Sequence, residues 1–180
     1  MTTIATDGLT IAADGKASAG TMVTSSKVNK VRVLNGVIYA VSGLEAYVQP
    51  LIDWHNAGAD PAKYPLAKGD GNESCLLVIV EPGRGQYYTY GIPYRVDVEF
   101  PFALGSGRDF AIGAMEAGAS PLEAVDIAVR RDVYSGGSIQ VLDIAEATRQ
   151  PATVCADRLH TVTMVRPNAD ASLDSGEVAA

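Results

Sequence analysis

The chain opens with the stretch MTTIATDGLTIAADGKASAG (residues 1–20), in which two threonines directly follow the initiator methionine. A residue as small as Thr2 normally allows methionine aminopeptidase to remove Met1. Thr2 would then carry a hydroxyl and a free α-amine, and this pair is a known arrangement of nucleophile and base. Met-Thr-Thr is also a common beginning among soluble proteins, so these residues alone do not predict catalysis.

Strand patterns continue outward from this stretch. The runs TIATDG (3–8) and LTIAAD (9–14) are short and rich in β-forming residues. Residues 30–43, KVRVLNGVIYAVSG, contain two β-rich runs that flank Asn35-Gly36. Asn-Gly is the strongest short hairpin signal, because both residues tolerate the positive φ of a type I′ turn. The pattern therefore predicts a hairpin at this dipeptide.

A first helix is predicted after Gly43. Pro50 interrupts its pattern, so this helix starts late or is kinked. Residues 56–74 are rich in Gly, Pro and Asp and predict a long surface loop. Residues 75–81 and 86–91 return to a strand pattern around a turn at 82–85. The apolar positions of the helix share one face, made of Leu44, Tyr47, Val48, Leu51, Ile52 and His55.

A second pair of helices is predicted further along the chain. Residues 108–118 place Phe110, Ala111, Ala114 and Met115 on one face and end at Gly118. The next helix begins with Ser120 as N-cap, Pro121 in its first turn and Glu123 completing a capping box. Residues 136–144 and 159–165 read as strands. Strands that flank grouped helices predict an α+β fold, with one domain over residues 1–166 and a frayed tail over 167–180.

Composition excludes several classes of function. The chain has 180 residues and a formal net charge of −7, without a Lys/Arg cluster that could follow a phosphate backbone. It has no signal-peptide pattern and no apolar run long enough for a membrane helix. We therefore expect no nucleic-acid partner, no membrane partner and a cytoplasmic location. Cys75 and Cys155 lack metal-site spacing and are expected to be reduced thiols.

Common active-site motifs give no competing prediction. The stretches GRGQYY (83–88) and GSGRDF (105–110) lack the third glycine of a dinucleotide loop, and no Gly-x-Ser-x-Gly occurs. His55 and His160 lie on apolar faces, where a packing role is favoured over a general base. DGNES (70–74) lacks the later Gly and Glu of a calcium loop. A serine or metal hydrolase is therefore poorly supported.

Six short pieces occur in order along the sequence: Thr2-Thr3-Ile4, AADGKASAG, SKVNKV, AVSG, LGSG and RRDVYSGG. This ordered set resembles the β-subunits of the proteasome and the bacterial HslV-type peptidase, which are N-terminal nucleophile hydrolases. The likeness runs from Thr2 to about Ile144. It implies a four-layer αββα sandwich and a threonine-type peptidase. The start at Thr2 is HslV-like, whereas DVYSGG fits proteasome β-subunits better.

The resemblance assigns catalytic roles to three residues. Thr2 matches the N-terminal threonine whose hydroxyl attacks the peptide carbonyl, Asp14 matches the family's aspartate, and Lys30 matches its lysine. A threonine hydroxyl is a poor nucleophile, and a nearby buried ammonium stabilises the developing alkoxide. Asp14 would keep Lys30 charged and oriented. Without the resemblance, a turn aspartate and a solvated strand lysine would be the favoured interpretation.

Further site residues follow from the same resemblance. Gly43 matches the glycine whose amide donates to the oxyanion, although it is otherwise a strand-end glycine. Ser106, Asp132 and Ser135 match residues that hydrogen-bond around the threonine amine, and Ser106 also suits a helix N-cap. Val41 lies near the position that floors the specificity pocket, where it predicts a preference for medium apolar residues.

The resemblance implies no cofactor for catalysis, but it implies a structural monovalent or divalent cation at the carbonyls of Val129, Asp132 and Ser135. It also implies unfolded polypeptide substrates, a homo-oligomeric ring of six or seven subunits and an ATP-dependent unfoldase partner. The family usually has two long helices where residues 44–72 stand here, so we expect a shortened first helical layer and leave ring stacking open. The apolar candidates for either core or subunit contacts are Trp54, Tyr47, Leu51, Tyr64 and Leu66.

Two alternatives stay open from the sequence. One is a small-amide hydrolase or acylase on the same fold. The other is a catalytically silent ring-forming scaffold that retains Met1.

Overall fold

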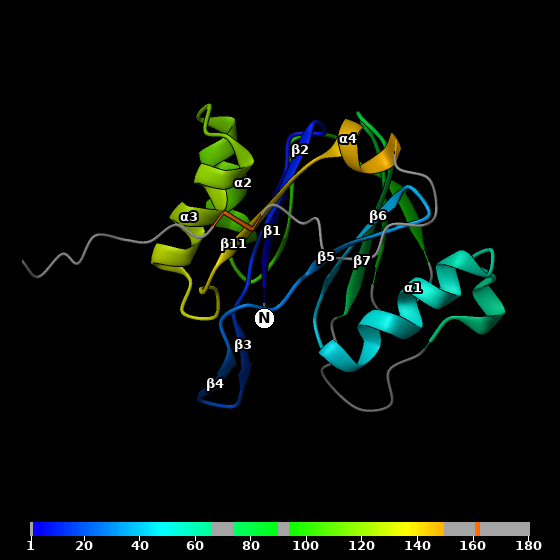
Figure 1. Cartoon of the computed structure of the whole chain (residues 1–180), viewed down its shortest axis with the longest axis horizontal. Helices are drawn as coiled ribbons and strands as arrows, with labels where there is room; N and C mark the ends of the chain where they lie inside the picture. The colour runs from blue at the N-terminus through cyan, green and yellow to red at the C-terminus, as the bar shows by residue number, and fades with distance from the viewer. Residues whose placement is uncertain (1, 66–73, 90–93, 150–160, 163–180) are drawn as a thin grey trace, which may run out of the picture.

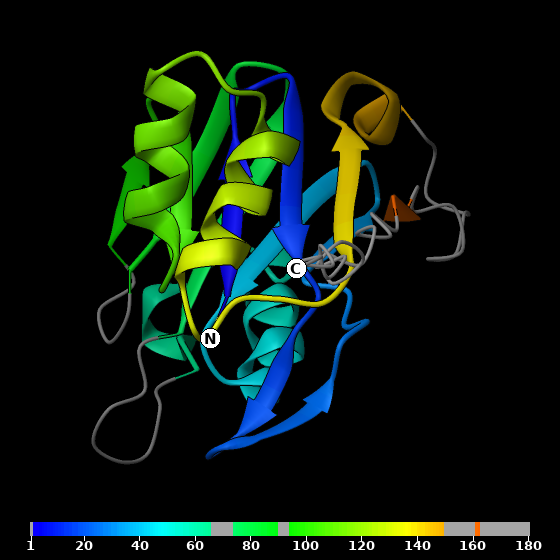
Figure 2. The ribbon, with the colours of Figure 1, turned by 90° about the vertical axis from the view of Figure 1, so that its left-hand side faces the viewer.

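Two antiparallel five-stranded sheets form the centre of the molecule in a computed structural model that describes residues 2–65, 74–89, 94–149 and 161–162 (Figure 1). A separate two-stranded hairpin extends beyond the first sheet (Figure 2). The first sheet has the strand order β10 (Phe102–Gly105), β1 (Thr3–Thr6), β2 (Thr10–Asp14), β11 (Ile139–Asp143) and β12 (Thr161–Val162). The second has the order β5 (Val31–Leu34), β6 (Val37–Ser42), β7 (Cys75–Glu81), β8 (Arg84–Tyr88) and β9 (Arg95–Asp97). The hairpin pairs β3 (Ala17–Ala19) with β4 (Met22–Ser25).

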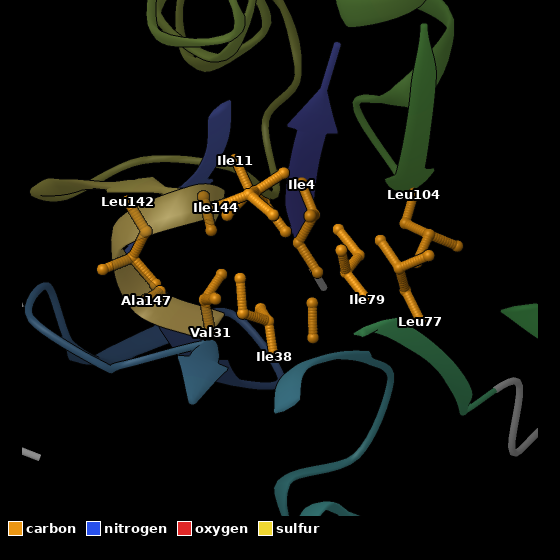
Figure 3. Close-up of a cluster of buried hydrophobic side chains, with 12 residues drawn as sticks. Ile4, Ile11, Val31, Ile38, Leu77, Ile79, Leu104, Leu142, Ile144 and Ala147 are labelled. Atoms are coloured by element: carbon orange, nitrogen blue, oxygen red, sulfur yellow. The ribbon is translucent and has the colours of Figure 1, made fainter. Parts of the chain in front are cut away.

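The two sheets pack face to face through a layer of apolar side chains that we call the inter-sheet cluster. Alternating residues of β1, β2, β6 and β7 point into it, as the period of a strand requires. α4 (Ile144–Arg149) closes its end through Ile144 and Ala147 (Figure 3). The buried members of the cluster are Ile4, Ile11, Ala13, Val31, Ile38, Ala40, Leu77, Ile79, Leu104, Leu142, Ile144 and Ala147.

Helices cover the outer faces of both sheets. α2 (Arg108–Glu116) and α3 (Pro121–Arg131) pack on the first sheet through Ala111, Met115, Ala124, Val125 and Ala128. α1 (Val48–Asn56) packs on the second sheet. Short 3-10 turns flank it at Glu45–Tyr47 and Pro61–Lys63. The layers therefore run helices, sheet, sheet, helix (Figure 1), and the predicted α+β class with antiparallel sheets is confirmed.

Local sequence signals account for several element boundaries. Asn35 and Gly36 have φ of 53° and 73° and join β5 to β6, which confirms the predicted hairpin. The hydroxyl of Ser120 accepts the amide of Glu123, and the amide of Ser120 donates to the Glu123 carboxylate, so the predicted capping box of α3 is confirmed. Gly118, with φ of 96°, follows the end of α2 as predicted.

The first helix starts late, as Pro50 indicated. α1 begins at Val48, and Pro50 is its third residue, where the missing amide hydrogen costs no helical bond. The prediction that Leu44 belongs to the buried face is wrong. Leu44 has an extended backbone and is 56% exposed, because the chain turns into the 3-10 segment only after it.

Among the other predictions for single residues, the buried position of Phe110 is wrong and the packing role of His55 is confirmed. Phe110 is 45% exposed, because α2 buries the neighbouring stripe through Ala111 and Met115. His55 packs against the rings of Tyr39 and Tyr88, which confirms a packing role. Trp54, Leu51 and Tyr64 are buried core residues of the chain itself, Tyr47 is partly buried against them, and Leu66 lies outside the described residues. His160, Cys155 and the predicted tail at 167–180 lie outside the described residues.

Candidate active site

The end of the two sheets opposite α4 gathers the chain segments that carry the predicted residues. β1 begins there, β2 ends there, and the turn from α3 to β11 passes beside them (Figures 1 and 2). Register fixes this arrangement, since Asp14 at the end of β2 pairs with Ile139 at the start of β11, and Thr3 pairs with Gly105 at the end of β10.

Asp14 is the centre of the site and is fully buried. Its Oδ1 accepts hydrogen bonds from the backbone amide of Thr3 and from Nζ of Lys30, both at 2.7 Å. Its Oδ2 accepts from the backbone amides of Gly136 at 2.9 Å and Lys16 at 3.2 Å. One carboxylate thus joins the N-terminal strand, the lysine and the turn before β11.

Lys30 and Asp14 form an ion pair in which the two side chains are 7% and 0% exposed. Burial lowers the pKa of the Lys30 ammonium from its ordinary value, and the opposing effect of Asp14 only partly offsets it. The pair therefore provides a desolvated positive charge beside the N-terminal strand. The predicted partnership of these two residues is present in the structure.

A second carboxylate, Asp132, collects the predicted hydroxyl groups. Its Oδ2 accepts from Oγ of Ser106 and Oγ of Ser135, both at 2.6 Å, and its Oδ1 accepts from the amide of Tyr134 at 3.1 Å. Burial alone would raise the pKa of Asp132. The hydrogen bonds from Ser106, Ser135 and the Tyr134 amide, together with the charge of Lys16, outweigh burial, so the pKa of this carboxyl lies below its ordinary value.

Thr2 lies immediately before β1 and is 3% exposed. Oγ of Ser106 lies 3.4 Å from its carbonyl oxygen. A Cβ at Gly105 would lie 1.9 Å from the same oxygen, so only glycine allows β10 to pass this close. Thr2 is thereby held between the end of β10 and the hydroxyl network of Asp132.

The following threonine was not predicted as a site residue. Thr3 is fully buried, and its Oγ1 lies 2.6 Å from Oγ of Ser135, which itself donates to Asp132. A Cβ at Gly107 would lie 2.0 Å from Oγ1 of Thr3. In the sequence, Thr3 stands out only because it follows Thr2. Its hydroxyl contact is with Ser135, which lies 132 positions away.

Lys16 is another residue that sequence reasoning missed. Its backbone amide donates a hydrogen bond to Oδ2 of Asp14, and its Nζ donates to the carbonyl oxygen of Val133 at 2.7 Å. Its positive charge also contributes to the lowered pKa of Asp132. Lys16 therefore ties the end of β2 to the turn that carries Asp132 and Ser135.

Gly43 directly follows β6 and has a φ of 127°, a conformation that side-chain-bearing residues rarely adopt. A Cβ at this position would lie 2.4 Å from Oγ of Ser74, which accepts the amide of Leu44 at 3.1 Å. Both observations explain a glycine here. Val41, the predicted pocket residue, is 5% exposed and packs with Tyr39 and Leu51 between β6 and α1.

The predicted cation ligands lie at the end of α3 and in the turn that follows. The carbonyl oxygen of Asp132 accepts the amide of Ser135 at 3.2 Å, which leaves one lone pair for an ion. The carbonyl oxygens of Val129, Asp132 and Ser135 suit a hard cation. The ammonium of Lys16 already donates a hydrogen bond to the carbonyl oxygen of Val133, which lies in the same turn. Over the described part of the chain, no cluster of three His, Cys, Asp or Glu side chains offers a metal site.

Comparison with known proteins addresses the resemblance directly. No family model matches the chain. Over 170 residues the chain is 28% identical to proteasome subunit beta type-5 of Gallus gallus, covering 76% of this chain and 66% of the chicken protein. It is 26% identical over 171 residues to proteasome subunit beta 1 of Thermococcus gammatolerans, covering 78% of this chain and 85% of that protein.

The resemblance to proteasome β-subunits is confirmed. The match to proteasome subunit beta type-8 of Canis lupus familiaris is also 28% identical, over 77% of this chain. The chain spans slightly less than two thirds of the chicken and dog subunits. Among solved structures, Thiobacillus denitrificans BPH matches with a TM-score of 0.59 and 21% identity, covering 80% of this chain and 98% of that one. This last likeness concerns the fold.

The helices of the described residues are all too short or too polar to cross a membrane.

Proposed function

We propose that this relative of the proteasome β-subunits is an N-terminal nucleophile hydrolase that cleaves peptide bonds with Thr2. The observation that carries the proposal is the buried Asp14, which holds both the amide next to Thr2 and the ammonium of Lys30 at 2.7 Å. A threonine hydroxyl needs an activating group close by to act as a nucleophile. Asp14 supports this by holding the N-terminal strand and the desolvated Lys30 together. The layer order helices, sheet, sheet, helix supports the αββα sandwich of such enzymes, with a short first helical layer.

The proposed chemistry begins when the bond between Met1 and Thr2 is cut and Thr2 gains a free α-amine. The amine accepts the proton of the Thr2 hydroxyl while the oxygen bonds to the substrate carbonyl carbon. The proton then passes to the leaving amine as the peptide bond breaks. Water hydrolyses the resulting ester and frees Thr2 for another turnover.

Charged and polar neighbours assist these steps. The ammonium of Lys30 stabilises negative charge on the attacking oxygen, and Asp14 keeps Lys30 in place. The amide of Gly43 donates to the carbonyl oxygen of the tetrahedral intermediate. The anionic Asp132 accepts hydrogen bonds from the hydroxyl groups of Ser106 and Ser135. It would thereby orient these two hydroxyl groups around the Thr2 amine. No step uses a metal ion, and the carbonyls of Val129, Asp132 and Ser135 would hold one only to stiffen the turn.

Substrate and assembly follow the family likeness. We propose unfolded polypeptides as substrates, with Val41 at the floor of a moderate apolar pocket. A homo-oligomeric ring of six or seven copies would confine the site in the cytoplasm and receive chains from an ATP-dependent unfoldase. Because Trp54 and Leu51 are occupied in the chain's own core, contacts between copies would use other surfaces. Native mass spectrometry at micromolar concentration measures the ring size.

Peptidase assays on paired variants test the proposed nucleophile. Thr2→Ala should abolish cleavage of fluorogenic peptides and leave the fold unchanged, whereas Thr2→Ser should keep part of the activity because it retains the hydroxyl. Loss of a nucleophile typically costs more than about 10³-fold in kcat. Full peptidase activity in Thr2→Ala would contradict the proposal. Cleavage of small amides alone by a monomer would favour the acylase alternative, and no turnover in a ring that retains Met1 would favour the scaffold.

A further inference from the structure

Gln140 is a buried polar residue whose place in the sheet would suit an apolar side chain. It lies on β11, is 2% exposed and pairs in register with Ala13 of β2. Ile139 contributes to the cluster beneath α2 and α3, whereas Leu142 contributes to the inter-sheet cluster. Strand alternation therefore places Gln140 on the Leu142 face, in an otherwise apolar layer.

Both ends of the Gln140 amide contact the segment that delivers Lys30 to the site. Oε1 accepts the backbone amide of Lys30 at 2.7 Å, and Nε2 donates to Oδ1 of Asn29 at 2.5 Å. Burying a primary amide costs free energy unless its groups are hydrogen-bonded. Here both hydrogen bonds go to two consecutive residues, of which the second is the lysine of the candidate site.

Backbone hydrogen bonds hold the chain before Lys30 at separate points. Residues 26–30 form neither helix nor strand, and β6 reaches the end of this segment, where the carbonyl oxygen of Lys30 accepts the amide of Val41 at 3.4 Å. At the start of this segment the carbonyl of Ser26 accepts the amide of Ser138 at 2.8 Å, and in its middle Val28 donates to the carbonyl of Gly15 at 2.9 Å. The Gln140 side chain secures the end of the segment, where Lys30 enters β5.

We propose that Gln140 is a positioning residue that sets the backbone of Lys30 so that its ammonium meets Asp14. The inference rests on the proposed function for its consequence in catalysis, but the positioning itself is a property of the folded chain. Gln140 does not touch the reacting atoms. It acts through the peptide of Lys30, and an apolar residue of similar size should fill its volume without performing this role.

The test compares Gln140→Met with Leu142→Met, a matched control on the same face of the same strand. In protein labelled with ¹³C at lysine Cε, the Lys30 resonance is identified by its loss in Lys30→Arg. Its titration reports the pKa of the ammonium, which is below the ordinary value in the native protein. In Gln140→Met we expect this pKa to fall further, because the buried ammonium loses the charge and hydrogen bond of Asp14 that raise it, and we expect the Lys30 amide to exchange faster. Leu142→Met should change neither.

Peptidase kinetics provide a second measurement on the same variants. We expect kcat of Gln140→Met to fall about tenfold, comparable to the loss of one neutral hydrogen bond, with KM changed little. Asn29 is exposed, so Asn29→Ala should fold even if Gln140→Met does not. Asn29→Ala should shift the Lys30 titration in the same direction by a smaller amount, and Asn29→Asp, which keeps the acceptor for Nε2 of Gln140, should restore the hydrogen bond.

The outcomes separate this inference from the proposed function. A Lys30 titration that stays native in folded Gln140→Met, or in Asn29→Ala if only that variant folds, overturns the positioning role whatever the activity. If the titration shifts but the native protein cleaves no peptide, the positioning role stands and the proposed function fails. If Leu142→Met shifts the titration as much as Gln140→Met, general loosening of β11 is the cause and the positioning role is wrong.

Discussion

The ammonium nitrogen of Lys30 lies 2.7 Å from Oδ1 of Asp14, and the same oxygen accepts the amide of Thr3 at 2.7 Å. The carboxylate thus links the lysine to the strand that begins one residue after Thr2. Both side chains are buried, so neither charge is well solvated without the other.

Removal of one partner of this pair should be costly for stability. Lys30→Met leaves Asp14 buried without its counter-charge, which typically costs about 3–5 kcal/mol. We expect the free energy of unfolding, measured by urea denaturation, to fall by this order, and peptidase activity to fall by at least about 10²-fold. The double variant Lys30→Met/Asp14→Asn should regain part of the stability but none of the activity. Recovery of activity in the double variant would contradict the proposed role of Lys30.

The lowered pKa of Asp132 predicts acid sensitivity. A carboxyl with a depressed folded-state pKa stabilises the protein above its unfolded pKa of about 3.9, and this stabilisation is lost as the pH falls toward the folded value. Thermal unfolding measured between pH 7 and pH 3 should therefore show a decline in Tm below about pH 4 that is smaller in Asp132→Asn. Since Ser106 and Ser135 cause most of the depression, the Ser106→Ala/Ser135→Ala variant should also show a smaller decline. An identical pH dependence in all three proteins would rule out this assignment.

Gly107 should tolerate no side chain, because its Cβ would lie 2.0 Å from Oγ1 of Thr3. Gly107→Ala should displace Thr3 from Ser135 and reduce peptidase activity strongly. Gly113 of α2 is the matched control, since a Cβ there meets nothing within 4 Å. Gly113→Ala should be neutral or stabilising by up to about 1 kcal/mol because alanine is the better helix former. Equal activity in the two variants would show that the Thr3 contact is dispensable.

Gly43 and Gly58 offer a similar comparison for the predicted oxyanion donor. Both have positive φ, but only at Gly43 would a Cβ collide with a neighbour, Ser74. Gly58→Ala should cost about 1 kcal/mol of stability through backbone strain and leave kcat unchanged. Gly43→Ala should lower kcat as well, because the displaced backbone no longer presents its amide to the oxyanion. A kcat for Gly43→Ala equal to that of Gly58→Ala would argue against an oxyanion role.

Much of the fold was predictable from local signals. The Asn35-Gly36 hairpin and the capping box at Ser120 each depend on residues within a few positions of one another, and the structure has both. The short strands β3, β4, β9 and β10 and the helix α4 were missed. Their residues are largely exposed or lack a clear period, and α4 forms because Ile144 and Ala147 fill the end of the inter-sheet cluster.

For the site, only the residues that match the family's motifs were predictable from the sequence. Asp14 and Lys30 were paired in advance, and so were Asp132 and Ser135, because the ordered pieces matched a family. Thr3, Lys16 and Gln140 were missed, since each acts through a contact with a residue distant in sequence. The buried Gln140 between Ile139 and Val141 was a readable signal, because a polar residue inside an apolar strand requires a partner.

The proposed peptidase activity depends on a free α-amine at Thr2. The most direct measurement produces the chain as a fusion in which a site-specific protease exposes Thr2, and follows peptide cleavage and intact mass together. We expect activity to rise in proportion to the species that begins at Thr2 and to be absent from the uncut fusion. Full activity in the uncut fusion, or none in fully processed and folded protein, would contradict the proposal.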